Sequence, residues 1–374
     1  MVASLRRAAL LTVLLLIASG CRTGADAARN ERTAARLAPR LGELLLVGFH
    51  GTALEDNPDV ERLLCRVRVG GVILFGRNIV DAEQVARLTR GLAERARECT
   101  GRPLLIAVDA EGGRVMRLGP GAGYTATLSH QDLGGANDLA QTELEARRIG
   151  GMLREAGINW NLAPVVDVGY NPANPVIVGE GRSFGANPAV VAAQARAFIT
   201  GMHAAGLLTA LKHFPGHGSS VADSHHGFVD VTDTANPKVE LAPYRLLLAE
   251  GVVDSVMTAH VFNRRLDRRY PATLSERTIT GVLRRGLGWR GVVVSDDMRM
   301  GAIDQHYGLT DAAVRAVRAG VDVVLIADDR LPGGASAADV VLESLRAAVT
   351  RGRIPVRRVD EALTRIEAMR ARLP

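Results

Sequence analysis

Asp223 and His225 have the residue types and the spacing of an acid–base dyad. Residues i and i+2 of an extended backbone point to the same side, so the carboxylate can reach the imidazole. A carboxylate bound to one ring nitrogen fixes the tautomer and stabilises the imidazolium, which suits histidine to general acid–base catalysis. The pair alone is a weak signal, because solvated loop residues account for most pairs of this kind.

Further polar clusters follow other apolar runs of the chain. They comprise residues 108–114 with Arg117 beyond them, residues 181–184, residues 212–218, His260, and residues 295–298. Each cluster begins where an expected strand passes into a loop. In an α/β barrel, side chains that carry chemistry lie just after the strand ends, on one face of the barrel. The clusters should therefore meet in space.

The elements that would position these clusters alternate between strand-like and helical patterns. Continuous, mostly β-branched apolar runs occupy residues 44–47, 71–75, 104–108, 160–163, 209–211, 255–258, 291–295 and 321–326. Helical periodicity occupies residues 82–97, 139–156, 188–205, 275–285, 309–319, 337–349 and 359–370. The continuous apolar runs are typical of parallel strands buried on both faces. They predict an α/β fold, a single (β/α)₈ TIM-type barrel, with a doubly wound open sheet as the alternative. The last two helical patterns should cover the barrel after its final strand.

The composition is that of an ordinary globular protein, with 374 residues, 47% of them hydrophobic and 23% charged. The net charge of +6 comes from scattered arginines, and aromatic residues make up only 4% of the chain. A nucleic-acid-binding protein more often gathers basic and aromatic residues on one face. We therefore expect no nucleic-acid partner.

The N-terminus has the pattern of an export signal. Arg6 and Arg7 precede an apolar run over residues 8–18, which is too short to span a bilayer comfortably. Small residues and Cys21 follow, and this junction resembles the lipobox of bacterial lipoproteins. We expect a lipoprotein-type signal peptide over residues 1–20, a lipid on Cys21, a tether over residues 21–36 and the barrel over residues 37–374. The protein would then be exported and held at a membrane by its lipid; a plain secretory signal is the alternative.

The remaining cysteines, Cys65 and Cys99, could form a disulfide in an exported protein or stay as two buried thiols. Sequence alone leaves both possibilities open. A metal site is not expected. His213 and His217 are four residues apart, but the proline and glycines around them disfavour the helix that would point both rings at one ion.

Four motifs resemble family 3 of the glycoside hydrolases, specifically its β-N-acetylglucosaminidase branch. They are KHFPGHGSSVADSH, VDAEGGRVMRL, GRSFG and VVVSDDMRMGAI, in the family's order, and the resemblance covers roughly residues 37–374. It implies that Asp296 is the nucleophile and that His225 is the general acid–base, oriented by Asp223. It also implies that the terminal sugar is held by Asp109, Arg117, Lys212 and His213, with Arg182 near the N-acetyl group. Neither a metal nor a cofactor is implied.

The same resemblance implies a retaining hydrolase that removes terminal β-linked N-acetylglucosamine from peptidoglycan-derived or related oligosaccharides. The usual retaining scheme uses two carboxyl groups, whereas here an imidazole replaces one of them. Because a neutral imidazole does not repel an anion, a phosphorylase that uses phosphate instead of water is one alternative. A β-glucosidase of the same family and a non-catalytic lipoprotein that binds cell-wall fragments are the others.

Overall fold

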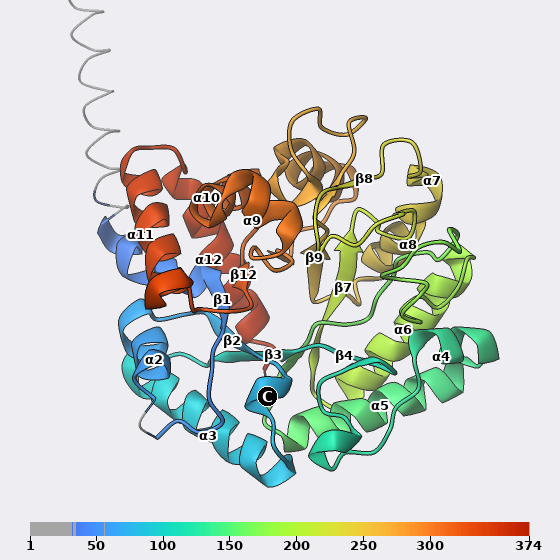
Figure 1. Ribbon diagram of the computed structural model, residues 1–374, viewed down its shortest axis with the longest axis horizontal. Helices are drawn as coiled ribbons and strands as arrows, with labels where there is room; N and C mark the ends of the chain where they lie inside the picture. The colour runs from blue at the N-terminus through green and yellow to red at the C-terminus, as the bar shows by residue number, and fades with distance from the viewer. Residues whose placement is uncertain (1–31, 33–34, 56, 374) are drawn as a thin grey trace, which may run out of the picture.

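The computed structural model describes residue 32, residues 35–55 and residues 57–373 (Figure 1). The predicted signal peptide, Cys21 and almost all of the predicted tether lie outside the described residues. Eight parallel strands form the centre of the described part: β1 (Leu45–Gly48), β2 (Gly71–Leu74), β3 (Leu105–Val108), β6 (Trp160–Asn161), β7 (Leu208–Phe214), β9 (Ser255–Thr258), β11 (Val292–Val294) and β12 (Val324–Ile326). All eight overlap the apolar runs from which strands were predicted.

The strands close into a barrel. Their order in the sheet is β11-β9-β7-β6-β3-β2-β1-β12, with β12 next to β1. Val323, just before β12, donates its N–H to the carbonyl of Val293 at 3.0 Å and accepts the N–H of Ser295 at 2.9 Å. These bonds join the two ends of the sheet. The structure confirms the predicted (β/α)₈ barrel and rules out the doubly wound open sheet.

Helices surround the barrel (Figure 1). The longer ones are α3 (Ala82–Thr100), α5 (Leu139–Glu155), α6 (Pro188–Ala204), α8 (Ala242–Glu250), α10 (Leu309–Ala319), α11 (Ala337–Thr350) and α12 (Val356–Arg370). Shorter ones are η1 (Ala38–Leu44), α2 (Pro58–Glu61), η3 (Gly76–Asn78), η4 (Pro120–Ala122), α4 (His130–Ala136), α7 (Pro237–Glu240), η5 (Ala272–Leu274), α9 (Gly301–Tyr307) and η7 (Pro332–Gly334). Two segments, η2 (Arg62–Val67) and η6 (Arg277–Gly286), are π-helices. The second replaces the α-helix expected over residues 275–285.

Capping residues explain where several helices begin and end. The carboxylate of Asp81 accepts the N–H of Gln84 at 2.8 Å at the start of α3, and Ser336 caps α11 in the same way. Gly101 ends α3 with a φ of 70°, a left-handed conformation that glycine adopts without strain. The chain then enters β3 within a few residues.

The core has two layers. Inward-facing side chains of the strands, such as Leu46, Trp160 and Val292, fill the barrel, while a larger cluster lies between the strands and the helices. Ile366 and Met369 of α12 belong to the inner cluster. Thus α12 covers one end of the barrel, as the C-terminal pattern predicted, while α11 packs beside α10.

Two short two-stranded pairings lie outside the barrel. They are β4 (Ala110–Gly112) with β5 (Val115–Met116), and β8 (Val229–Asp230) with β10 (Val261–Phe262). The sequence did not predict them. Both lie in loops that follow barrel strands, so they shape the face where the polar clusters meet.

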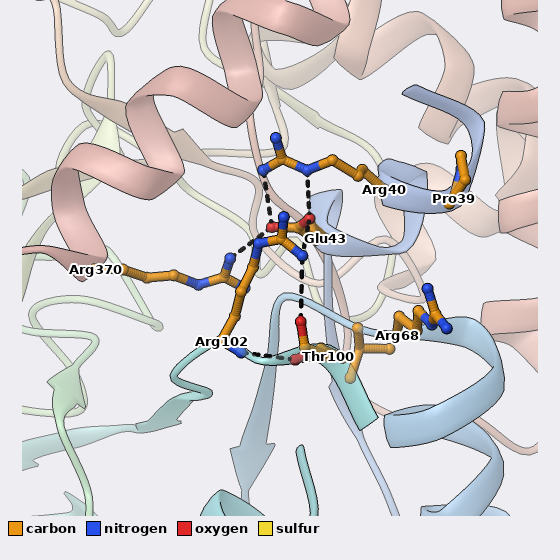
Figure 2. A pocket seen from close by; sticks show the side chains of 8 residues that line it. Pro39, Arg40, Glu43, Arg68, Thr100, Arg102 and Arg370 are labelled. Carbon is orange, nitrogen blue, oxygen red and sulfur yellow. Dashed lines mark hydrogen bonds and ion pairs between the residues drawn. The ribbon is translucent and has the colours of Figure 1, made fainter. Parts of the chain in front are cut away.

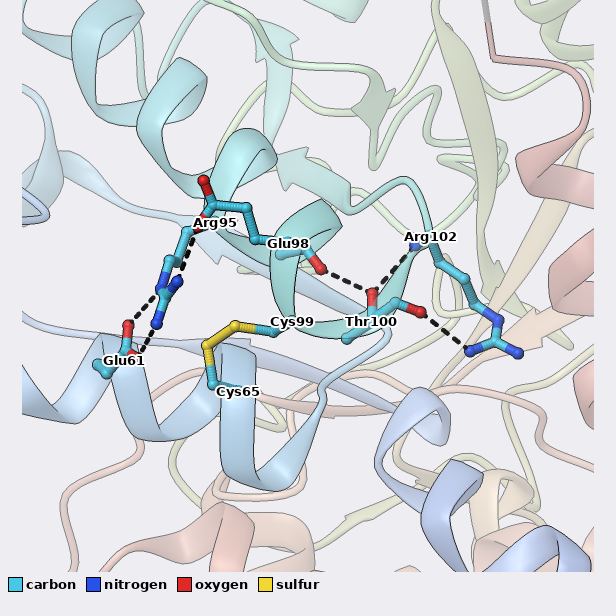
Figure 3. The surroundings of a disulfide bond; sticks show 8 residues. Glu61, Cys65, Arg95, Glu98, Cys99, Thr100 and Arg102 are labelled. Carbon is cyan, nitrogen blue, oxygen red and sulfur yellow. Dashed lines mark hydrogen bonds and ion pairs between the residues drawn. A yellow bond between two sulfur atoms is a disulfide. The ribbon is translucent and has the colours of Figure 1, made fainter.

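Cys65 of η2 and Cys99 of α3 form a disulfide, with their Cα atoms 5.0 Å apart (Figure 3). The structure thus takes one of the two possibilities that the sequence left open. The bond joins the end of η2 to the end of α3, immediately before the chain enters β2 and β3. No described helix is both long and apolar enough to cross a membrane.

Candidate active site

A cavity of about 380 Å³ opens at the carboxyl ends of the barrel strands. Its lining includes all eight residues that the sequence assigned to catalysis or to sugar binding: Asp109, Arg117, Arg182, Lys212, His213, Asp223, His225 and Asp296. Lys212 and His213 lie within β7, and the loops after β3, β6, β7 and β11 supply the others. The polar clusters therefore meet on the one face where a barrel is expected to carry its chemistry.

Asp296 follows β11 by two residues and borders the cavity. Its Oδ1 accepts the N–H of Asp297 at 2.8 Å. Burial by itself would raise the pKa of this carboxyl, but the nearby imidazoles of His260, His213 and His225 outweigh it and lower the pKa to about 2. Asp296 is thus ionised at any ordinary pH, as a nucleophile must be.

The neighbouring Asp297 is different. Its Oδ1 accepts the N–H groups of Arg299 and Ala327 at 3.1 and 2.9 Å, so the carboxyl anchors the loop after β11. Burial raises its pKa to about 6 despite these bonds. Asp297 is therefore a poorer nucleophile than Asp296. Its carbonyl also contacts Nε2 of His260 at 2.9 Å.

The predicted dyad is formed. His225 Nδ1 lies 2.6 Å from Asp223 Oδ1, and the same oxygen accepts the His225 N–H at 2.9 Å. Because Asp223 holds Nδ1, the other ring nitrogen is left for a partner in the cavity. The His225 side chain is 55% exposed, so solvent reaches it.

A buried ionic network also lines the cavity. Lys212, 2% exposed, places its Nζ 2.8 Å from Asp109 Oδ1 and 2.6 Å from Glu111 Oε1. Arg182 makes two 2.8 Å bonds to the two oxygens of Glu111. Burial would raise the pKa of Glu111, but Arg182 and Lys212 hold it well below its usual range. Two cations and two anions are thus fixed before any ligand binds.

His213 is held from behind by an aspartate that the sequence did not single out. Nδ1 of His213 lies 2.6 Å from Asp167 Oδ2, and Asp167 Oδ1 accepts the N–H of His217 at 2.7 Å. The other ring nitrogen of His213 is 3.2 Å from Arg182 Nη2. Asp167 thereby fixes both the ring of His213 and the turn of the loop that continues toward the dyad.

Arg117 reaches the cavity from the β4–β5 hairpin. Its Nη2 lies 3.8 Å from Asp109 Oδ2, and its guanidinium carbon lies 5.8 Å from the ring centroid of Phe75, within cation–π range. This ion pair borders the cavity and leaves the Arg117 side chain 37% exposed.

The structure places the predicted side chains around one cavity, and further residues hold them in position. Glu111 bonds Arg182, Nε2 of His217 contacts Oγ of Ser224 between the two dyad residues, and Nε2 of His260 contacts the carbonyl of Asp297 next to Asp296. Asp167 and Phe75 were missed. An acidic residue directly after the apolar run of residues 162–166 was the available signal for Asp167.

The geometry offers nothing that requires a metal at the predicted residues. In the described part of the chain, the group of possible ligand atoms close enough to hold an ion is that of Glu61, Cys65 and Cys99, and its two sulfurs are bonded to each other. The expectation of a site without metal stays a prediction.

Comparisons with known proteins agree with the predicted family. The sequence model of the family described as "Glycosyl hydrolase family 3 N terminal domain" matches residues 36–369. Beta-hexosaminidase LpqI of Mycobacterium tuberculosis is 35% identical over 351 residues, which cover 91% of this chain and 84% of that protein. Beta-hexosaminidase A of Pseudoalteromonas piscicida is 37% identical over 290 residues, 72% of this chain and 47% of that protein.

A solved structure is similar to this chain and belongs to the same family. The family 3 β-N-acetylglucosaminidase of Paenibacillus sp. str. FPU-7 superposes with a TM-score of 0.84 at 40% identity, over 90% of this chain and 62% of that one. This chain thus spans about half of the P. piscicida relative and less than two thirds of the Paenibacillus protein. The matches confirm the predicted family and support the prediction of a glycosidase. The chain belongs to family 3 of the glycoside hydrolases.

Proposed function

We propose that this chain is a retaining β-N-acetylhexosaminidase that removes terminal β-linked N-acetylglucosamine. The observation that carries the proposal is that an ionised Asp296 and the His225–Asp223 dyad line one cavity of sugar size. The names of the relatives, β-hexosaminidases and a β-N-acetylglucosaminidase, point the same way.

The reaction takes two steps. Asp296 attacks the anomeric carbon while protonated His225 gives its Nε2 proton to the leaving glycosidic oxygen, and a covalent glycosyl-enzyme results. The neutral imidazole then takes a proton from water, whose oxygen attacks the same carbon and releases Asp296. Two inversions leave the configuration unchanged. Asp223 stabilises the imidazolium at the start and at the end of the cycle.

The ionic network fits recognition of the terminal sugar. Asp109 and Lys212 offer an acceptor and donors to sugar hydroxyls, and Arg182 offers guanidinium N–H groups that suit the carbonyl of an N-acetyl group. All three are already held by one another or by Glu111, so ordering them adds little entropic cost on binding.

Peptidoglycan-derived fragments are the substrate class we propose, together with export and a lipid on Cys21. Cys21 and the signal lie outside the described residues. The disulfide between Cys65 and Cys99 supports export, because such bonds persist in oxidising compartments.

The first test is an assay of purified protein on aryl β-N-acetylglucosaminide and aryl β-glucoside, each with and without phosphate. We expect turnover of the first substrate, little of the second, and a reducing sugar as product under both conditions. Release of a sugar phosphate would identify the phosphorylase alternative. Absence of turnover on both substrates would refute the glycosidase.

The second test addresses the dyad. His225→Ala should lower kcat/KM by about 10²–10⁴ for poor leaving groups and by much less for acidic phenols, which need little protonation. His226→Ala is the matched control, because that ring is 87% exposed and lies 3.8 Å from Asp223. A uniform loss across the leaving-group series would remove His225 from the acid role.

A further inference from the structure

Figure 2 shows a second cavity, of about 230 Å³. It lies at the amino ends of the barrel strands, opposite the end that carries the active site. Its polar lining consists mainly of four arginines, Arg40, Arg68, Arg102 and Arg370, around one carboxylate, Glu43. Glu43, Arg68 and Arg102 each lie a few residues before a barrel strand, whereas the active site lies after the strands. We call this cavity the basic pocket.

Glu43 is already paired with two of the arginines. Its carboxylate lies 2.7 Å from Arg40 Nε and 2.6 Å from Arg370 Nη1. Both partners are themselves tied down elsewhere, since Arg40 also bonds Glu367 at 2.5 Å and Arg370 Nη2 donates to the carbonyl of Gly70 at 2.9 Å. One carboxylate therefore holds two guanidinium groups in fixed positions.

Donors in the basic pocket remain without an anion. The guanidinium of Arg102 is 3.8 Å from Glu43, and within the described residues its other bond is to the carbonyl of Thr100, at 3.4 Å. Arg68 has no ion-pair partner in the described part of the chain, and Figure 2 shows it at the edge of the cavity. Arg370 is 6% exposed, yet its buried Nε has no hydrogen-bond partner. A buried donor without a partner is costly unless something binds it.

The charges are unbalanced as well. Four guanidinium groups line the cavity, and they have two carboxylate partners, Glu43 within it and Glu367 on Arg40, which leaves two positive charges in excess (4 − 2). The pKa of Arg370 is lowered, first by burial and then, despite Glu43, by the nearby charges of Arg102 and Arg40. An anion between these groups would relieve that repulsion and satisfy the free donors.

We propose that the basic pocket binds a phosphate-type oxyanion. Arginine forks match the oxygens of phosphate, and a set of four, two of them held in place by Glu43, favours it over a larger or singly charged ligand. The cavity is smaller than the roughly 300–1,000 Å³ typical of sites for drug-sized ligands, so it suits a small anionic group and not a glycan. Neither Asp296 nor the dyad lines it.

The disulfide contributes to this site. Cys65 and Cys99 each precede an arginine of the basic pocket by three residues, Arg68 and Arg102 respectively. Figure 3 shows Thr100 and Arg102 directly beyond Cys99. The bond therefore joins the two turns that carry Arg68 and Arg102, and it limits how far these two arginines can separate under their mutual repulsion.

The same phosphate chemistry has two sources, free phosphate and the headgroup of an anionic phospholipid. Pro39, which lines the basic pocket, is 18 residues after Cys21 (39 − 21). A chain of that length reaches at most about 60 Å. A lipid on Cys21 would therefore keep the pocket within reach of a membrane surface, and this proximity makes the headgroup worth testing separately.

The test compares the full chain with the double variant Arg68→Gln/Arg102→Gln. The matched control, Arg90→Gln/Arg318→Gln, removes the same charge from two exposed arginines outside the pocket. Calorimetric titration with inorganic phosphate should show binding in the full chain and in the control. The pocket variant should bind at least about 10-fold more weakly, because each charged hydrogen bond commonly contributes a factor of ten or more. Melting without phosphate verifies that all three proteins are folded.

The second arm uses flotation with vesicles of phosphatidylcholine alone or mixed equally with phosphatidylglycerol. All three proteins keep the same N-terminus, so any contribution of a lipid anchor cancels. If the pocket variant also loses its preference for phosphatidylglycerol vesicles, the headgroup is the source. If it loses only phosphate binding, free phosphate is the ligand. If it matches the control in both arms, the arginines form a purely structural network and the proposal is wrong.

Discussion

Replacing Glu111 by glutamine should weaken both the fold and the active site. Glu111 is 1% exposed and holds two buried cations, Lys212 at 2.6 Å and Arg182 at 2.8 Å. The variant keeps the shape of the side chain and removes its charge. Lys212 then keeps Asp109 as its carboxylate partner, whereas Arg182 is left with the charges of Asp167 and Asp109 near it.

The expected loss of stability follows from that geometry. Breaking a buried ion pair by removing one partner costs roughly 3–5 kcal/mol. With an unfolding entropy of about 2.1 cal/mol/K per residue over about 340 residues, this corresponds to a fall in melting temperature of roughly 4–7 °C. Arg182 should also shift, and because a displacement of about 1 Å can cost a factor of 10², we expect kcat/KM to fall by about that much.

The pH dependence of stability provides an independent test of the role of Glu111. The pKa of Glu111 in the folded protein lies well below 4.5, so its contribution is complete above pH 4.5 and is lost as the pH falls below that value. The difference in melting temperature between wild type and Glu111→Gln should therefore shrink progressively below pH 4.5. Scanning calorimetry from pH 7 to pH 3 measures it.

Glu145→Gln is the matched control. Glu145 of α5 is buried and bonds Arg148 at 2.7 Å and the N–H of Leu128 at 2.9 Å, but it does not line the cavity. It should lose some stability and keep its kcat/KM. If Glu111→Gln behaves like this control, or if its melting deficit does not change with pH, the network does not position the site and our reasoning fails.

Three further predictions concern other parts of the chain. Burial raises the pKa of Glu240 to about 7, so its contribution to stability is complete below pH 4.5 and is lost as the pH rises through 7. At pH 8 the free energy of unfolding of Glu240→Gln should exceed that of wild type by up to about 3 kcal/mol. A difference at pH 8 equal to that at pH 4 would contradict this. Loss of the disulfide, by Cys65→Ser with Cys99→Ser, should lower the free energy of unfolding by about 3–4 kcal/mol for a separation of 34 residues; dithiothreitol should shift wild type equally and leave the variant unchanged. Cys21→Ala should move the protein from the membrane fraction to the soluble exported fraction, and unchanged fractionation would exclude the lipid anchor.

The barrel was predictable because its strands are apolar. The positions at which the strands end were harder to predict. The run at residues 209–211 predicted only part of β7, which continues through Lys212 and His213 to Phe214. Polar side chains inside a strand hide it from a hydrophobicity pattern. Here they are tolerated because Asp109, Glu111 and Asp167 satisfy them. For β6 the prediction was too long, because the strand ends at Asn161 although its apolar run continues to residue 163. The carbonyls of Ala163 and Pro164 still accept N–H groups of β7, but Pro164 has no N–H to donate in return.

The site was predictable in its members and not in its connections. The dyad was visible because its partners are two residues apart. Asp167, by contrast, contacts His213 and His217, which are 46 and 50 residues away. No local spacing reveals such a contact. The arginines of the basic pocket escaped notice for the same reason, because residues from 40 to 370 meet there only after the barrel closes.

The proposed mechanism explains why Asp296 and His225 differ in burial. In that mechanism Asp296 must stay ionised next to the sugar, and it lies in the cavity with a pKa of about 2. In the same mechanism His225 must first protonate an aglycone that leaves and then deprotonate a water that arrives in its place. A group with that task has to border solvent, and a 55% exposed ring on a loop does so. Exposure, however, would let the ring turn away between the two steps. The 2.6 Å bond from Asp223 to Nδ1 opposes that rotation, so the orientation that a buried group would owe to packing is here supplied by one carboxylate.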